Sequence, residues 1–140
     1  MQEGDIKNVA RLEEKYFSQP WSEDGLRHYL ENGQTLFIVA KHDSEVAGYA
    51  AVLCAADEGN LVSIAVDEEF RNMGIAREIL DILYEELVKN GVEKIFLEVR
   101  ESNEAAISLY RSENFEEIGK RKGFYEKPKE DALLFMRNLK

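Results

Sequence analysis

The residues best suited to chemistry lie between a strand-like segment, residues 61–66, and a long amphipathic helix, residues 75–90. The loop and the first helical turn read Arg71-Asn72-Met73-Gly74-Ile75-Ala76-Arg77. A helix begins with backbone N–H groups that lack intrahelical partners, and its dipole attracts anions to them. Gly74 and Ala76 keep side-chain bulk away from these donors, and Arg71 and Arg77 add positive charge. The pattern predicts a cradle for phosphate or diphosphate groups.

An ordinary strand–loop–helix connection can carry a glycine for backbone reasons alone. The run from Arg71 to Arg77 by itself is therefore weak evidence for a phosphate site. The loop has neither the Gly-Lys-Ser/Thr of a Walker A motif nor the G-x-G-x-x-G of a dinucleotide fingerprint. A cofactor other than a nucleoside triphosphate or NAD must therefore bring the phosphates.

Glu98 is the second candidate, because it interrupts the apolar strand-like run Ile95-Phe96-Leu97-Glu98-Val99. A charge in such a strand costs free energy unless it has a partner or a task. A glutamate that faces solvent on an alternating strand is the other interpretation, and the residues alone leave both open.

The composition is that of a folded acidic domain. The chain has 140 residues, is 44% hydrophobic and carries a net charge of −10. Its length suits one domain, its apolar content argues against disorder, and its acidity argues against phosphate-driven binding to nucleic acid. No apolar run reaches the about 20 residues of a membrane span, and the first residues do not resemble a secretory signal. We therefore expect a cytoplasmic protein with no membrane or nucleic-acid partner.

Metal and thiol sites are not expected. Cys54 is the single cysteine, so it forms neither an intramolecular disulfide nor a cysteine-rich metal site, and we interpret it as a buried apolar residue. His28 and His42 lack metal-ligand spacing. Glu130 and Asp131 are interpreted as a solvated turn.

The first half of the chain predicts two helices followed by three strands. The first helix runs from Asp5, which can cap it, to about Tyr16. The second follows Ser22 as its N-cap and ends at Asn32-Gly33. Strands are predicted at residues 35–40, 45–55 and 60–66, with turns at 42–44 and 57–59, and such short connections favour an antiparallel meander.

The second half returns to helical periodicity and then alternates. The helix over residues 75–90 ends at Gly91 as C-cap, and its predicted apolar face consists of Ile75, Ile79, Ile82, Leu83 and Leu87. A strand at 95–99, a helix at 103–112 and strands at 115–121 and 132–139 follow. This order predicts a mixed α/β fold with helices on both faces of one sheet.

Residues 66–79 resemble the Q/R-x-x-G-x-G/A motif of the Gcn5-related N-acetyltransferases (GNAT), and the element order is similar to that of the family, with an opening strand reduced to Met1-Gln2 or lost. Four further runs resemble its ribosomal-protein alanine N-acetyltransferase (RimI-type) subgroup: residues 17–22, 60–77, 97–110 and 122–132. The chain departs from the pattern at Ala76 in place of the last glycine, at Asn114 in place of glycine and at Phe124 in place of tyrosine.

The resemblance implies one GNAT domain over residues 1–140, with a central, mostly antiparallel sheet of about six to seven strands. It implies acetyl-coenzyme A (acetyl-CoA) as cosubstrate and no metal. The residues that it implies for cofactor binding are Ile64, Ala65, Val66, Arg71, Asn72, Met73, Gly74, Ile75, Ala76, Arg77 and Asn103. Among the strand residues only the backbone is expected to act, with the Val66 N–H facing the thioester carbonyl.

The implied reaction is direct attack of an amine on the thioester, with Glu98 as general base and Tyr110 as general acid. Tyr110 could instead only pack against Phe115. The implied substrate is the N-terminal amine, most readily of alanine, on a small-subunit ribosomal protein. A small amine such as a polyamine and a non-catalytic acetyl-CoA-binding module are the alternatives. Whether Tyr125 and the loop at Pro20-Trp21 contact the acceptor stays open at this level.

Overall fold

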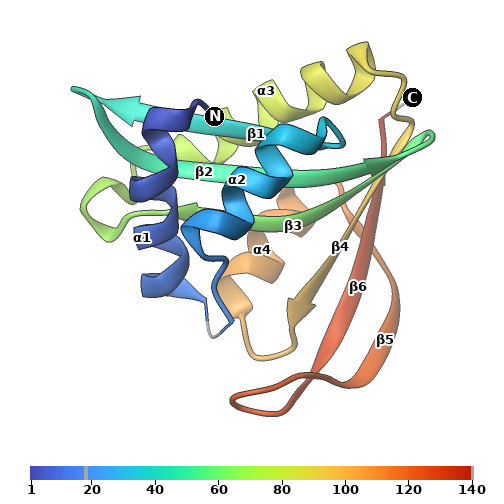
Figure 1. Cartoon of the computed structure of the whole chain (residues 1–140). Helices are drawn as coiled ribbons and strands as arrows, with labels where there is room; N and C mark the ends of the chain where they lie inside the picture. The colour runs from blue at the N-terminus through green and yellow to red at the C-terminus, as the bar shows by residue number, and fades with distance from the viewer. Residues whose placement is uncertain (18, 140) are drawn as a thin grey trace.

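A six-stranded sheet with the order β1-β2-β3-β4-β6-β5 forms the centre of the computed structural model, which describes residues 1–17 and 19–139 (Figure 1). Ser18, within the matched run 17–22, lies outside the described residues. The strands are β1 (Thr35–His42), β2 (Glu45–Ala55), β3 (Glu58–Val66), β4 (Lys94–Arg100), β5 (Glu116–Tyr125) and β6 (Glu130–Asn138). Neighbouring strands run antiparallel except β3 and β4, which are parallel. The predicted mixed α/β sheet and its antiparallel meander are confirmed.

Two helices cover each face of this sheet (Figure 1). The helices are α1 (Ile6–Tyr16), α2 (Glu23–Asn32), α3 (Ile75–Lys89) and α4 (Glu104–Ser112), with short 3-10 turns η1 (Glu3–Asp5) and η2 (Glu68–Phe70). Helices α1 and α2 pack on one face, and α3 and α4 pack on the other. None of the described helices is both long and apolar enough to cross a membrane.

Several predicted helix ends are confirmed by their caps. The Ser22 hydroxyl accepts the Gly25 N–H at 3.0 Å, and Gly33 ends α2 with a left-handed φ of 75°. The Asn103 side chain accepts the Ala106 N–H at 3.1 Å and so begins α4. Asn114 takes the left-handed turn after α4 with φ 67°, where the family pattern has glycine.

Three local predictions are wrong. The Asp5 side chain does not cap α1, because η1 precedes the helix. Its carboxylate accepts the Gln2 N–H at 2.9 Å and pairs with Lys41 Nζ at 2.8 Å. The turn predicted at residues 57–59 is shorter, since β3 already begins at Glu58. Ile82 is 48% exposed, because the buried stripe of α3 runs through Leu80 instead.

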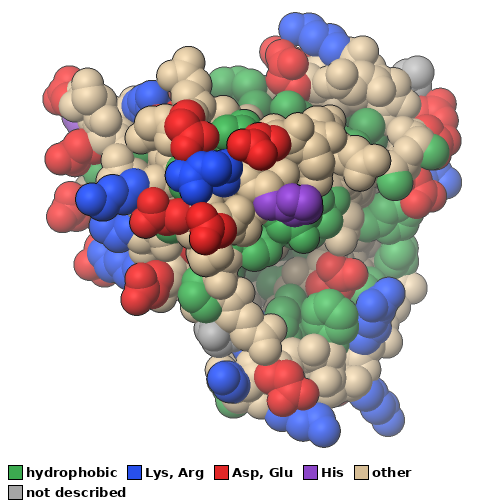
Figure 2. Space-filling model, viewed as in Figure 1, with side chains coloured by type: hydrophobic (Ala, Val, Ile, Leu, Met, Phe, Trp, Pro, Cys, Tyr) green, Lys and Arg blue, Asp and Glu red, His purple; other side chains and the backbone are tan. Residues whose placement is uncertain are grey.

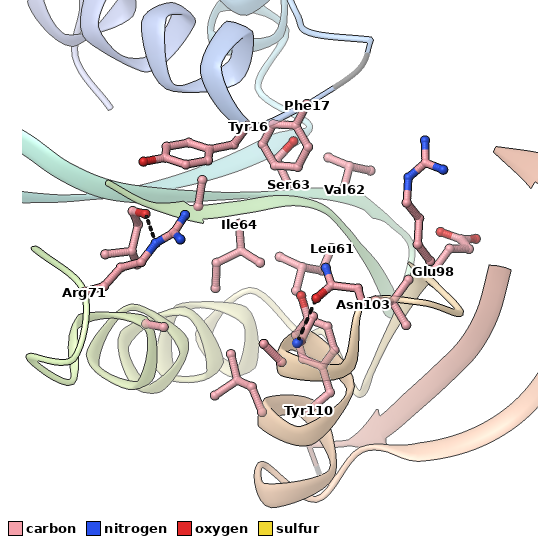
Figure 3. Close-up of a pocket in the computed structure, with 18 of the residues that line it drawn as sticks. Tyr16, Phe17, Leu61, Val62, Ser63, Ile64, Arg71, Glu98, Asn103 and Tyr110 are labelled. Atoms are coloured by element: carbon pink, nitrogen blue, oxygen red, sulfur yellow. Dashed lines mark hydrogen bonds between the residues drawn. The ribbon is translucent and has the colours of Figure 1, made fainter. Parts of the chain in front are cut away.

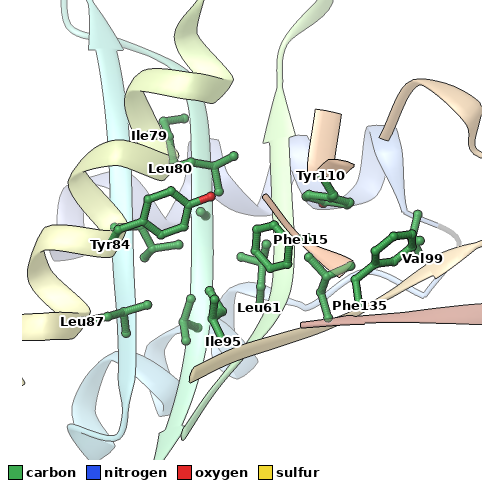
Figure 4. Packing of buried hydrophobic residues seen from close by; sticks show 14 of the residues in the cluster. Leu61, Ile79, Leu80, Tyr84, Leu87, Ile95, Val99, Tyr110, Phe115 and Phe135 are labelled. Atoms are coloured by element: carbon green, nitrogen blue, oxygen red, sulfur yellow. The ribbon is translucent and has the colours of Figure 1, made fainter. Parts of the chain in front are cut away.

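The core behind the sheet fixes α3 and α4 in place. Five α3 side chains are buried against the sheet, namely Ile79, Leu80, Leu83, Tyr84 and Leu87 (Figure 4). Tyr110 of α4 packs into the same cluster with Phe115 and Phe135. This packing fixes α3 and Tyr110 of α4 against the same face of the sheet.

Candidate active site

Strands β3 and β4 part in the middle of the sheet. They pair from Glu58 with Lys94 to Leu61 with Leu97 and no farther. Just beyond, the register of β3 on β2 shifts so that Val62 is an extra residue, which is a β-bulge. From Val62 to Val66, the edge of β3 that faces β4 therefore has no strand partner among the described residues.

A cleft of about 950 Å³ opens where the strands part. Figure 2 shows a hollow lined largely by hydrophobic side chains, below α2 and above the β5–β6 hairpin. In Figure 3, Tyr16 and Phe17 lie on one side of β3, while Asn103 and Tyr110 lie on the other. Arg71 and Glu98 stand at opposite ends of this view.

The structure brings the residues singled out in the sequence into this one cleft. Those that line it are Ile64, Ala65, Val66, Arg71, Asn72, Gly74, Ile75, Ala76, Arg77, Glu98, Asn103 and Tyr110. Met73 is not among them, and it is 56% exposed, so only its backbone stays a candidate for cofactor binding. The described residues contain no group of three or more His, Cys, Asp or Glu that could hold a metal ion.

The N-terminus of α3 opens into the cleft. Gly74 precedes the helix with a left-handed φ of 77°, and no side chain in the described part of the chain caps the first turn. A Cβ added to Gly74 would meet no protein atom within 4 Å. The left-handed backbone favours glycine here, and the space beside it is open. Free first-turn N–H groups next to open space suit an anionic diphosphate.

Arg71, in the loop before α3, and Arg77, in the first turn of α3, both contact other groups of the protein. Arg71 Nε donates to the Val66 carbonyl at 3.1 Å, and its guanidinium lies 4.8 Å from the centre of the Tyr16 ring. Arg77 pairs with Glu113 Oε2 at 3.1 Å and donates to Ser112 Oγ at 3.0 Å. Both arginines line the cleft, and both already have hydrogen-bond partners within the protein.

Asp67, a buried acidic residue that no sequence pattern singles out, lies at the start of the segment that leads from β3 to the loop before α3. Asp67 is 4% exposed and accepts hydrogen bonds from Arg11, Lys15 and Tyr16 of α1. Burial alone would raise the pKa of Asp67, but these hydrogen bonds outweigh it and hold the pKa below its usual value. No local pattern signals this cluster, since its partners are more than fifty residues away in the chain.

Glu98, Tyr110 and Tyr125 share the other end of the cleft. Glu98 is half-buried on β4, between the buried Leu97 and Val99. Burial and the neighbouring Tyr125 raise the pKa of Tyr110, so its phenol stays protonated at neutral pH. Burial, followed by the charge of Glu98, raises the pKa of Tyr125 to about 12.

Tyr110 also makes the packing contact considered from the sequence. Its ring meets that of Phe115 edge-on, with the centroids 5.5 Å apart. The side chain thus belongs to the core and also lines the cleft, so the two interpretations are compatible.

Residues 6–115 match the Acetyltransferase (GNAT) family. The chain belongs to this family of acetyltransferases. GNAT enzymes take acetyl-CoA as acetyl donor, and in this chain the N-terminus of α3 lines the cleft.

Relatives within the family are similar over nearly the whole chain. The [ribosomal protein bS18]-alanine N-acetyltransferase of Escherichia coli K12 is 33% identical over 132 residues, 93% of this chain and 88% of that protein. The protein of the same name from Haemophilus ducreyi is 31% identical over 137 residues, 94% of this chain and 92% of its own.

Solved GNAT structures have the same fold. The crystal structure of the E. coli ribosomal-protein-S18-alanine N-acetyltransferase has a TM-score of 0.90 and 31% identity, covering 99% of this chain and 90% of that chain. A chain of the NatC complex bound to Gag peptide and CoA has a TM-score of 0.84 at 21% identity, covering 99% and 93%, and shows likeness of fold only.

Proposed function

We propose that residues 1–140 act as one acetyl-CoA-dependent N-α-acetyltransferase domain that modifies the N-terminal amine of a ribosomal protein, with alanine as the first residue. The observation that carries the proposal is the parting of β3 and β4 after Leu61 and Leu97, which opens one cleft onto both the α3 N-terminus and Glu98. The names of relatives at 31–33% identity support the substrate class. Such a substrate would be met in the cytoplasm.

The donor would occupy the α3 side of the cleft. Backbone N–H groups from Met73 to Arg77 would bind its diphosphate, because that first turn has no capping side chain. The unpaired edge of β3 at Ile64, Ala65 and Val66 would pair with its pantetheine arm. Asn103 would donate through its amide nitrogen, since its oxygen already caps α4. Acetyl-CoA supplies the acetyl thioester.

Glu98 would take the proton from the attacking amine. An α-amine has a pKa near 8, so about a tenth of it is already neutral at pH 7, and one carboxylate suffices as base. As the amine nitrogen bonds to the acetyl carbon, the carbonyl oxygen gains negative charge, and the Val66 N–H would donate to it. The carbon–sulfur bond then breaks, and Tyr110 would give its proton to the thiolate that leaves.

Mass spectrometry of a pool of alanine-initiated peptides, incubated with the protein and acetyl-CoA, tests this proposal. We expect one added acetyl group on the α-amine and loss of most turnover in Glu98→Gln and Tyr110→Phe. An unmodified pool beside acetylated spermidine would favour the small-amine alternative. Binding of acetyl-CoA without turnover of any amine would favour the non-catalytic module. Wild-type rates in both variants would contradict the assigned roles.

A further inference from the structure

Arg100 contacts the loop that joins β5 to β6 at several points. It is the last residue of β4, two positions after Glu98. Its Nη1 donates to the Pro128 carbonyl at 2.9 Å, and its Nη2 donates to the Glu126 carbonyl at 3.0 Å. Its guanidinium also lies over the Tyr125 ring, 4.4 Å from the centroid. Arg100, on the same strand as Glu98, therefore contacts Tyr125, Glu126 and Pro128.

Glu130 completes this arrangement from the other end of the loop. Its Oε1 lies 3.3 Å from Arg100 Nη1, and its Oε2 accepts the Ser102 N–H at 2.7 Å. The Arg100 and Glu130 side chains are only 22% and 19% exposed. Hydrogen bonds from Ser102 and the charge of Arg100 hold the pKa of Glu130 below its usual value. The expectation of a merely solvated turn at this residue is therefore wrong.

The strand ladder next to the loop is interrupted, and only the pair of Tyr125 with Glu130 closes it. The pairing of β5 with β6 is irregular between Arg121 and Tyr125. Tyr125, Lys127 and Pro128 nevertheless line the cleft together with Glu98. Shifting this loop would move one wall of the cleft relative to the candidate base.

We infer that Glu130 and Arg100 form a clasp that positions the β5–β6 loop as the wall along which an acceptor peptide extends from its amine at Glu98. This rests on the proposed function. Glu130 is a positioning residue, because it acts through Arg100 and the loop residues Tyr125, Lys127 and Pro128, whereas Arg100 itself also lines the cleft. A small amine at Glu98 would meet this wall only at Tyr125, whereas a longer acceptor would also extend along Lys127 and Pro128. The clasp therefore serves long acceptors, and the coenzyme end of the cleft, which is formed by α3, does not depend on it.

A neighbouring ion pair provides the control. Lys120 of β5 and Glu101, the residue after β4, pair at 2.8 Å with side chains 42% and 47% exposed. This pair joins the same two parts of the fold, but neither residue lines the cleft. Glu101→Gln and Glu130→Gln thus make the same chemical change at a surface pair and at the clasp.

The experiment compares steady-state kinetics of wild type, Glu130→Gln, Arg100→Lys and Glu101→Gln, using an alanine-initiated peptide of about ten residues and alanine amide as acceptors. Lysine keeps the charge at position 100 but loses the guanidinium fork. We expect both clasp variants to raise the KM for the peptide about tenfold. The KM for alanine amide and the Kd of CoA should stay within about twofold, and Glu101→Gln should match wild type throughout.

Unchanged peptide KM in both folded clasp variants would overturn the inference while leaving the proposed function intact. Equal losses toward peptide, alanine amide and CoA would also overturn it, because they indicate general loosening. If Glu130→Gln does not fold, Arg100→Lys carries the comparison. Wild-type protein that acetylates no peptide would overturn the proposed function, and the inference with it.

Discussion

The hydroxyl group of Tyr16 lies 3.2 Å from Asp67 Oδ1 and accepts the Glu68 N–H at 2.8 Å, so it ties the end of α1 to the segment that leads into the α3 loop. The ring of the same residue lies under Arg71. The chain after α1 reaches the cleft at Phe17 and Gln19, and the loop before α3 lines the same cleft at Arg71 and Asn72. The Tyr16 side chain therefore connects α1 with the segment before α3.

Tyr16→Phe should weaken CoA binding while the fold stays intact. The change leaves a buried carboxylate with one hydrogen bond fewer and the Glu68 N–H without its acceptor, which costs about 1 kcal/mol in loop positioning. Calorimetry should then report a Kd about five times higher. Tyr29→Phe, whose ring stacks on Trp21 outside the cleft, is the matched control. Equal Kd values for the two variants would contradict the coupling.

Two glycines should respond differently to alanine. Gly74→Ala forces a side chain into a left-handed backbone at the α3 N-terminus, with a penalty of about 1 kcal/mol, and places a methyl group beside the free N–H donors. CoA affinity should fall several-fold, while the backbone penalty lowers Tm by only a few degrees. In Gly48→Ala, the new Cβ would stand 2.8 Å from the Ala65 carbonyl, so the cost of about 1–3 kcal/mol should appear in Tm. The reverse pattern would argue against a binding role for the α3 terminus.

Glu13 should make stability depend on pH. It is 2% exposed, and burial raises its pKa above the usual value although hydrogen bonds from Trp21 and Ser63 oppose this. A carboxyl group with a raised folded pKa binds more protons in the native state, so stability falls as pH rises from about 4.3 through the raised pKa. Glu13→Gln should remove this loss, and thermal melts of both proteins between pH 4.5 and 7.5 measure it. Parallel curves would show that Glu13 is not the titrating group.

The pH–rate profile should rise and then stay level. Turnover increases as the α-amine loses its proton near pH 8. Because burial raises the pKa of Tyr110, the proposed acid stays protonated and no fall is expected up to about pH 10. Tyr110→Phe should lower kcat by about 10²-fold or more. A descending limb in wild type below pH 10 would argue that another group is the acid.

Local signals account for most of the fold. Ser22, Gly33 and Asn103 mark helix ends with caps that depend only on neighbouring residues, so they can be recognised from the sequence. The prediction for Ile82 is wrong because this residue lies beside the buried stripe of α3, whose centre is at Leu83 and Leu87. A count of apolar residues at helical spacing does not show where the centre of the buried stripe lies.

Long-range pairs could not be predicted in the same way. Asp67 meets Tyr16 across 51 positions, and Glu130 meets Arg100 across 30, with no periodicity that joins them. The cleft itself depends on where two parallel strands stop pairing, which follows from the bulge at Val62. Resemblance to a family named the candidate residues that line the cleft, and only the tertiary structure shows the side chains that contact them.

A crystal structure of the protein with CoA tests the central claim most directly, namely that the first turn of α3 binds the diphosphate of the donor. We predict the diphosphate within hydrogen-bond distance of backbone N–H groups between Met73 and Arg77, and the sulfur between Val66 and Tyr110. A diphosphate bound away from α3, or a sulfur remote from Tyr110, would contradict the account.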